Sequence, residues 1–197
     1  LRTGDNHLSI HFVSAWTRGQ TLGAQYEPRP NNYPGPANLM RKMACSFGWD
    51  WGPTLVTAGI WQPVTLESWS TARLSCVRPE VTLQGANGHV RVHAGIEGVG
   101  ALTVRATVGG VTETLPASGE AIDLVVKSPE LWWPHHLGNQ PLYELVVDLL
   151  DGDRVIDTWS RQIGFRSVRL DTTPDEHGTP FTLLVNDVPI YVCGANW

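Results

Sequence analysis

Apolar and polar residues alternate along most of this chain, and a period of two is typical of β-strands with one buried face. Between residues 70 and 166 the alternating runs are short and regularly spaced. They predict strands at 73–77, 80–83, 89–96, 101–108, 111–115, 121–126, 142–150 and 154–163. Asp151-Gly152 lies between two such runs, which is a strong signal for a β-hairpin. The pattern predicts an immunoglobulin-like β-sandwich, although no pair of cysteines flanks a central tryptophan.

The first 69 residues have a different pattern, with fewer strand-like runs. Leu8, Ile10 and Phe12 share one face of a predicted strand at 7–13, and strand character is predicted again at 59–69. Residues 19–37 contain three glycines and four prolines, so we predict a long irregular loop there, followed by a helical turn at 38–43. Loops of such length are uncommon in compact domains unless they have a function.

The C-terminal residues predict a second hairpin, in which strands at 181–185 and 188–192 flank Asn186-Asp187. The apolar run that follows reaches residue 197 without a closing turn or a polar tail, and the chain starts with Leu1 rather than methionine. Natural domains usually end in a frayed surface segment. We therefore expect this chain to be part of a longer protein.

Composition excludes several classes of partner. The 197 residues carry a net charge of −5 and no basic patch, so we expect no nucleic-acid binding. No run approaches the roughly 18 apolar residues of a membrane span, so no membrane association is expected. Cys45, Cys76 and Cys193 have neither disulfide-framework nor metal-ligand spacing, and we predict buried free thiols and no metal or cofactor. This cysteine usage favours the cytoplasm, although a signal peptide preceding Leu1 would change that.

The strongest candidate for chemistry is Trp49-Asp50-Trp51, which is flanked by two glycines. Indole rings suit surfaces that are dry at one end and wet at the other, and a carboxylate is rarely buried without partners. A polar hook beside flat apolar walls matches a pyranose ring, which presents hydroxyls and C–H faces. The alternative is a tight turn with the indoles packed inward and the carboxylate capping the backbone. Most of the nine tryptophans are expected in the core or at domain interfaces.

No complete catalytic site is evident in this chain. Glycosidases need two facing carboxylates, and none of the nine glutamates has a sequence setting that suggests this role. No G-x-S-x-G nucleophile elbow is present, and no glycine-rich phosphate loop precedes a helix. We therefore assign no catalytic residue.

Three groups of motifs, in this order, resemble family 2 glycoside hydrolases of the β-mannosidase type. The groups are Arg41-Lys42 with Phe47–Pro53 and Gly59–Val64; Leu131–Pro134 with Gly138–Tyr143 and Ile163–Arg166; and Phe181, Val185-Asn186 and Pro189-Ile190 leading to Gly194–Trp197. The resemblance implies an all-β chain with three parts. Residues 1–69 would be the C-terminal part of a galactose-binding-like jelly-roll, 70–166 the immunoglobulin-like sandwich, and 167–197 the start of a (β/α)8 catalytic barrel.

The resemblance also implies a retaining exo-hydrolase that removes terminal β-linked mannose, with both catalytic glutamates beyond Trp197. Asp50 would bind hydroxyls of the mannose in the −1 subsite, and Trp51 and Trp49 would wall that pocket. Asn196 and Trp197 would lie at the end of the first barrel strand, where barrel enzymes build their active sites. For Trp197, a residue of the barrel interface is an equal alternative.

Two other classes stay open, a non-catalytic carbohydrate-binding module and a purely structural scaffold, as does another specificity within family 2. The partner implied by the resemblance is a β-mannoside oligosaccharide. Half a jelly-roll would leave unpaired strand edges and exposed apolar surface, so we expect the chain alone to form homo-oligomers or aggregates.

Overall fold

The structure is a computed structural model that describes residues 3–32 and 35–194. It divides into two compact units, residues 1–67 and 68–197. Strands predominate, and all of the regular strands belong to the second unit.

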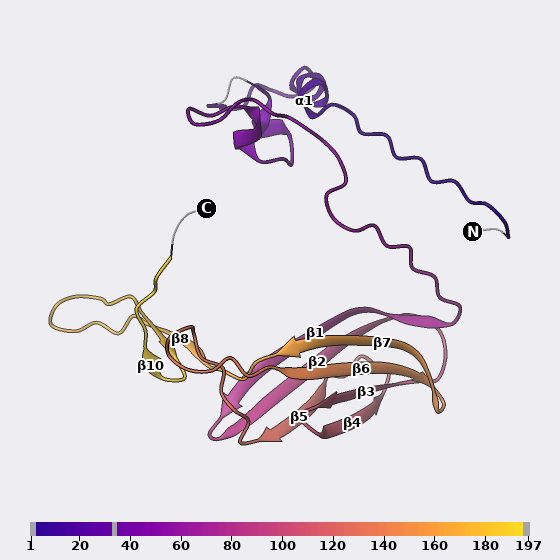
Figure 1. Cartoon of the computed structure of the whole chain (residues 1–197), viewed down its shortest axis with the longest axis vertical. Helices are drawn as coiled ribbons and strands as arrows, with labels where there is room; N and C mark the ends of the chain where they lie inside the picture. Colours follow the sequence, from indigo (N-terminus) through magenta and orange to yellow (C-terminus); the bar gives the residue numbers. More distant parts are fainter. Residues whose placement is uncertain (1–2, 33–34, 195–197) are drawn as a thin grey trace. The chain divides into compact units, whose positions relative to one another are not determined.

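The second unit contains a two-sheet antiparallel sandwich (Figure 1). One sheet has the order β1-β2-β5, formed by β1 (Ala72–Gln84), β2 (Asn87–Gly98) and β5 (Ile122–Lys127). The other has the order β4-β3-β6-β7, formed by β4 (Val111–Pro116), β3 (Leu102–Val108), β6 (Tyr143–Asp151) and β7 (Arg154–Ile163). The all-β fold class and the sandwich are thereby confirmed.

Alternating side chains of both sheets form the core. In β3 the residues Leu102, Val104, Ala106 and Val108 are buried, while those between them are only half-buried. The same alternation buries three residues of β5 and three of β6, at Ile122, Leu124, Val126, Leu145, Val147 and Leu149. Each buried aliphatic side chain contributes roughly 1.5–3 kcal/mol relative to an exposed one, so this two-residue period is the main source of stability.

One predicted pair of strands is in fact a single strand. The separate runs at 73–77 and 80–83 both belong to β1, which pairs continuously with β2 except for an irregularity between Leu74 and Cys76. Pro79 lies opposite Val92 within this ladder. Proline lacks an N–H donor but is tolerated here because β1 is an edge strand.

A small third sheet follows the sandwich, with the order β10-β9-β8. Its strands are β8 (Val168–Asp171), β9 (Thr182–Val185) and β10 (Val188–Pro189). The predicted hairpin is present, and both turn residues, Asn186 and Asp187, have positive φ of 50° and 63°. Such a turn matches the twist of its strands. The sequence did not predict β8, and β10 ends earlier than the predicted strand at 188–192.

The regular elements of the first unit, in the residues that the structure describes, are short helices. They are α1 (Ala15–Gly23) and two 3₁₀ turns, η1 (Ala37–Leu39) and η2 (Ala44–Phe47). The predicted loop at 19–37 was therefore wrong at its start, which lies within α1. The predictions of strands at 7–13 and 59–69 were also wrong: these segments pair with no other strand among the described residues, and Leu8 is 78% exposed. A β-strand requires hydrogen bonds to a neighbouring strand. The alternation of apolar residues within one segment does not show whether such a neighbour is present.

One prediction about burial was wrong as well. Cys45, Cys76 and Cys193 are free thiols as expected, but all three are exposed. Among the eight described tryptophans, none is buried within its own unit and only Trp159 packs against the sandwich core. The expectation that the others lie at domain interfaces stays a prediction.

Candidate functional site

The motif Trp49-Asp50-Trp51 forms the tip of a tight turn. Trp49 and Gly52 exchange main-chain hydrogen bonds of 3.4 and 3.3 Å, which close the turn and place Asp50 and Trp51 at its two central positions. The two indole rings are 4.9 Å apart between centroids and inclined at 52°. The backbone thus presents one carboxylate and two indoles together.

The base of this turn is anchored by a buried aromatic residue. Phe47, at the end of η2, is fully buried and stacks on Trp16 of α1, with ring centroids 5.8 Å apart. Gly35 approaches the same indole so closely that a Cβ at this position would be 2.6 Å from it. The chain leaving the turn is fixed too, because Leu55 N–H donates to the Ser46 carbonyl at 3.0 Å.

Gly48 gives the chain the bend between the buried anchor and the exposed tip. Its φ of 117° and ψ of 146° lie in a region that only glycine adopts readily. Gly52, by contrast, has no positive φ, and nothing lies within 4 Å of a Cβ built on it. Of the two glycines that flank the motif, Gly48 is therefore required by its backbone conformation and Gly52 is not.

The side chains of the tip face solvent. Trp51 is 77% exposed, Trp49 is 43% exposed and Asp50 is exposed. Across residues 3–32 and 35–194, no hydrogen-bond donor or cation pairs with the Asp50 carboxylate. The turn therefore does not match the alternative in which the indoles pack inward and the carboxylate caps the backbone. A carboxylate accepts hydrogen bonds only, and beside apolar rings it suits a ligand with several hydroxyl donors.

Asn196 and Trp197 were predicted to complete this site, but they lie outside the described residues. Of the five predicted substrate-binding residues, the structure brings together Trp49, Asp50 and Trp51. The role of each in binding stays a prediction.

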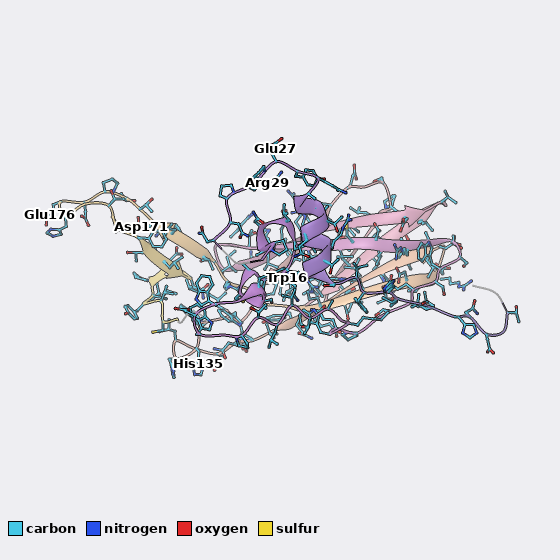
Figure 2. All side chains as sticks on the ribbon, turned by 90° about the horizontal axis from the view of Figure 1, so that it is seen from above. Trp16, Glu27, Arg29, His135, Asp171 and Glu176 are labelled. Atoms are coloured by element: carbon cyan, nitrogen blue, oxygen red, sulfur yellow. The ribbon has the colours of Figure 1, made fainter. Side chains whose placement is uncertain are left out.

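A second feature of the first unit was not predicted from the sequence. A hollow of about 290 Å³ lies between α1 and the segment that follows it, lined by residues that include Trp16, Glu27 and Arg29 (Figure 2). The hollow depends on α1, which was not predicted either. The signal for this helix was Ser14, whose hydroxyl accepts a hydrogen bond from Thr17 N–H and caps α1. The abundance of glycine and proline after residue 18 favoured the prediction of a loop over that of a helix.

The groups with clearly shifted pKa values lie outside this site. Arg78 holds the pKa of Glu80 below its ordinary value through a side-chain hydrogen bond, and Arg91 does the same for Asp123. Both pairs lie on the β1-β2-β5 sheet of the sandwich. Ion pairs along strands support a structural role for this part of the chain.

Metal-binding clusters and membrane-spanning helices are two further features of the part of the chain that the structure describes. No group of three or more potential metal ligands converges there. None of its helices has the length and apolar character needed to cross a membrane.

Comparisons with known proteins extend these observations. Residues 1–62 match the profile described as the glycosyl hydrolase 2 galactose-binding domain-like family, and residues 61–166 match glycosyl hydrolases family 2. β-Mannosidase B of Thermothelomyces thermophilus is 37% identical over all of this chain, and that of Aspergillus fumigatus is 36% identical over 98% of it. The chain spans about a quarter of the length of each, since the aligned region is 25% of both relatives.

A solved structure agrees with the relatives found by sequence. The crystal structure of β-D-mannosidase from Dictyoglomus thermophilum superposes with a TM-score of 0.82 at 32% identity, covering 93% of this chain and 24% of that one. The fold of this chain is thus similar to that of part of this glycosidase. The chain belongs to glycosyl hydrolases family 2.

Proposed function

We propose that this chain is part of a retaining, exo-acting β-mannosidase that removes terminal β-linked mannose from oligosaccharides. The catalytic glutamates lie outside the chain. The relatives named β-mannosidase support the class of reaction. The observation that carries the proposal is the exposed Asp50 carboxylate at the tip of a turn, with the contacting indoles of Trp49 and Trp51 on either side in the sequence and a buried aromatic anchor at the base.

In this proposal Asp50 accepts hydrogen bonds from hydroxyls of the mannose in the −1 subsite. Hydrogen bonds to a charged group contribute roughly 1.5–3 kcal/mol each, enough to select a hydroxyl configuration. Trp51 and Trp49 cover apolar C–H faces of the sugar. Asn196 and Trp197 contribute from the end of the first barrel strand.

The proposed domain division follows from the same assignment. Residues 1–69 form the end of the sugar-binding jelly-roll, 70–166 the immunoglobulin-like domain, and 167–197 the entry to the catalytic barrel. The exposed side chains at 7–13 are then covered by jelly-roll strands that this chain lacks. The sandwich acts as a scaffold whatever the specificity of the complete enzyme.

Substitution of Asp50 by Asn in the complete enzyme tests the substrate role. Loss of one charge-assisted hydrogen bond is expected to lower kcat/KM for an aryl β-mannoside by about 10- to 100-fold. Asp153→Asn is the matched control, since this aspartate is exposed in the β6–β7 turn of the sandwich. A folded Asp50→Asn enzyme with wild-type turnover would refute the role of Asp50.

A carbohydrate-binding module is the second candidate, favoured by the exposure of both indoles within the first unit itself. Calorimetry of this chain alone with mannose and mannobiose separates the two. Millimolar or tighter binding would favour the module. The enzyme assignment predicts no measurable binding, because its pocket is completed by barrel residues beyond this chain.

A further inference from the structure

An arginine is stacked on a tryptophan at the point where the chain enters the sandwich. The Arg73 guanidinium lies 3.9 Å from the ring centroid of Trp69, close to the start of the second unit. The same guanidinium donates a hydrogen bond of 2.7 Å to Glu97, its neighbour across the β1-β2 ladder. Because β1 begins only at Ala72, this stack holds a side chain that precedes the sheet against side chains that belong to it.

A second stack of the same kind lies where the chain leaves the sandwich. The Arg166 guanidinium, in the connection between β7 and β8, lies 4.5 Å over the ring of Trp132. The main chain of Trp132 is fixed on both sides, since its N–H donates to the Phe165 carbonyl at 2.9 Å and its carbonyl accepts from the Asn186 side chain at 3.1 Å. This stack therefore belongs to the joint between the sandwich and the small β8-β9-β10 sheet.

The two stacks lie at opposite ends of the sandwich (Figure 1). Leu74, near the start of β1, donates its N–H to the Asp157 carboxylate at 2.7 Å, so β1 starts beside the first half of β7. A strand rises about 3.3 Å per residue, which puts the end of β7, six residues after Asp157, roughly 20 Å further along. The segments that enter and leave the sandwich are thus each held by one arginine–tryptophan stack, which we call the boundary stacks.

The boundary stacks restrict how the sandwich is oriented against its neighbours in the chain. A cation is attracted to the face of an indole ring, so a segment that carries one partner resists rotation away from the other. Asp50 belongs to the first unit, and in the proposed function the catalytic barrel follows the small sheet. We propose that Arg73 and Arg166 are positioning residues, which hold both ends of the sandwich so that Asp50 is placed where the barrel completes the sugar site; this inference rests on the proposed function.

The first experiment measures the kinetics of the complete enzyme on an aryl β-mannoside. Arg73→Ala and Arg166→Ala should each raise KM about threefold to tenfold and leave kcat within about twofold, because a displaced carboxylate weakens ground-state and transition-state binding alike. Arg161→Ala is the matched control, since Arg161 lies 5.5 Å over Trp159 in the same strand and joins no outside segment to the sandwich. A lower kcat at unchanged KM would indicate loss of folded enzyme only and would overturn the proposal, as would unchanged kinetics.

A double-mutant cycle tests whether the effect depends on Asp50. In the Asp50→Asn enzyme, Arg73→Ala and Arg166→Ala should cause little further rise in KM, because the carboxylate that they position is already removed. Fully additive effects would show that the two arginines act elsewhere and would overturn the proposal.

A distance measurement without substrate separates this proposal from the proposed function. Cys45 lies in the first unit, Cys76 in β1 and Cys193 after the small sheet, and all three thiols are free and exposed. In the complete enzyme, with cysteines beyond this chain replaced by serine, spin labels on Cys45 and Cys76 report on the first boundary stack. Labels on Cys76 and Cys193 report on the second.

The width of each distance distribution is the observable. Arg73→Ala should broaden the distances of the first pair of labels and Arg166→Ala those of the second, whereas Arg161→Ala should broaden neither. Unchanged widths would overturn the proposal. Broadened distances together with wild-type turnover of Asp50→Asn would refute the role of Asp50, and the boundary stacks would still be shown to hold the ends of the sandwich.

Discussion

The side-chain amide of Asn186 donates a hydrogen bond of 3.1 Å to the main-chain carbonyl of Trp132, 54 residues earlier in the chain. The carbonyl oxygen of the same side chain accepts from Ser167 N–H at 3.0 Å. Trp132 in turn donates its own N–H to the Phe165 carbonyl, and the Arg166 guanidinium lies 4.5 Å over its indole. Asn186 thereby joins the small β8-β9-β10 sheet to the end of the sandwich.

Loss of the Asn186 side chain is expected to destabilise this joint. Asn186→Gly should lower the free energy of unfolding by about 1–3 kcal/mol, because the Trp132 carbonyl and the Ser167 N–H lose a partner. Glycine is used because Asn186 has φ of 50°. Asp187→Gly is the control, since φ is 63° there and no partner of its side chain is described. Denaturant unfolding measures both, and equal midpoints for the two variants would contradict the role of Asn186.

The anchor under the Asp50 turn makes a second prediction. Phe47→Ala should cost about 3–5 kcal/mol of stability, because it leaves a cavity beneath Trp16. The loosened turn should also lower kcat/KM on an aryl β-mannoside in the complete enzyme. Val99→Ala serves as control, since that side chain is 81% exposed between β2 and β3 of the sandwich and its truncation should change neither quantity. A Phe47→Ala enzyme with unchanged melting temperature and turnover would show that the anchor is dispensable.

The two glycines of the turn should respond differently to the same substitution. Gly48→Ala forces a Cβ into a backbone conformation suited to glycine, at a cost of about 1–3 kcal/mol, and should displace Asp50. Gly52→Ala should be tolerated, because that residue has no positive φ and open space surrounds its Cβ position. Thermal melts and turnover of the two variants test this. Equal effects would mean that Gly48 does not set the direction of the turn.

The ion pair between Arg91 and Asp123 predicts a pH dependence of stability. A hydrogen bond from Arg91 lowers the pKa of Asp123, with smaller contributions from the charges of Arg91, His93 and His89. A carboxyl whose pKa is depressed by folding stabilises the protein above its unfolded pKa of about 3.9 and loses that contribution as the pH falls through the folded value.

Arg91→Gln should therefore lower the melting temperature slightly at pH 7 and have no effect at a pH where Asp123 is protonated in both states. The effect is small because both side chains are more than half exposed. Arg154→Gln, at the start of β7, is the control and should show no such pH dependence. If Arg91→Gln lowered the melting temperature in acid as much as at pH 7, the ion pair would be excluded as the cause.

The sandwich could be predicted from the sequence because its signals are local. Alternation at Leu102, Val104, Ala106 and Val108 specifies which face of β3 is buried, whatever covers it. The hairpin turn at Asn186-Asp187 is specified by two adjacent residues that tolerate positive φ. The motif around Asp50 could be found in the same way, since its residues are contiguous.

Other features depend on residues that are distant in the sequence, and only the tertiary structure decided them. The stacking of Trp16 on Phe47, the close approach of Gly35 and the hollow beside α1 join segments up to 31 residues apart. The exposure of the tryptophans was decided in the same way, because burial depends on what the rest of the fold brings to each ring. A periodic pattern states which face of a segment prefers to be covered; it carries no information about which distant segment covers it.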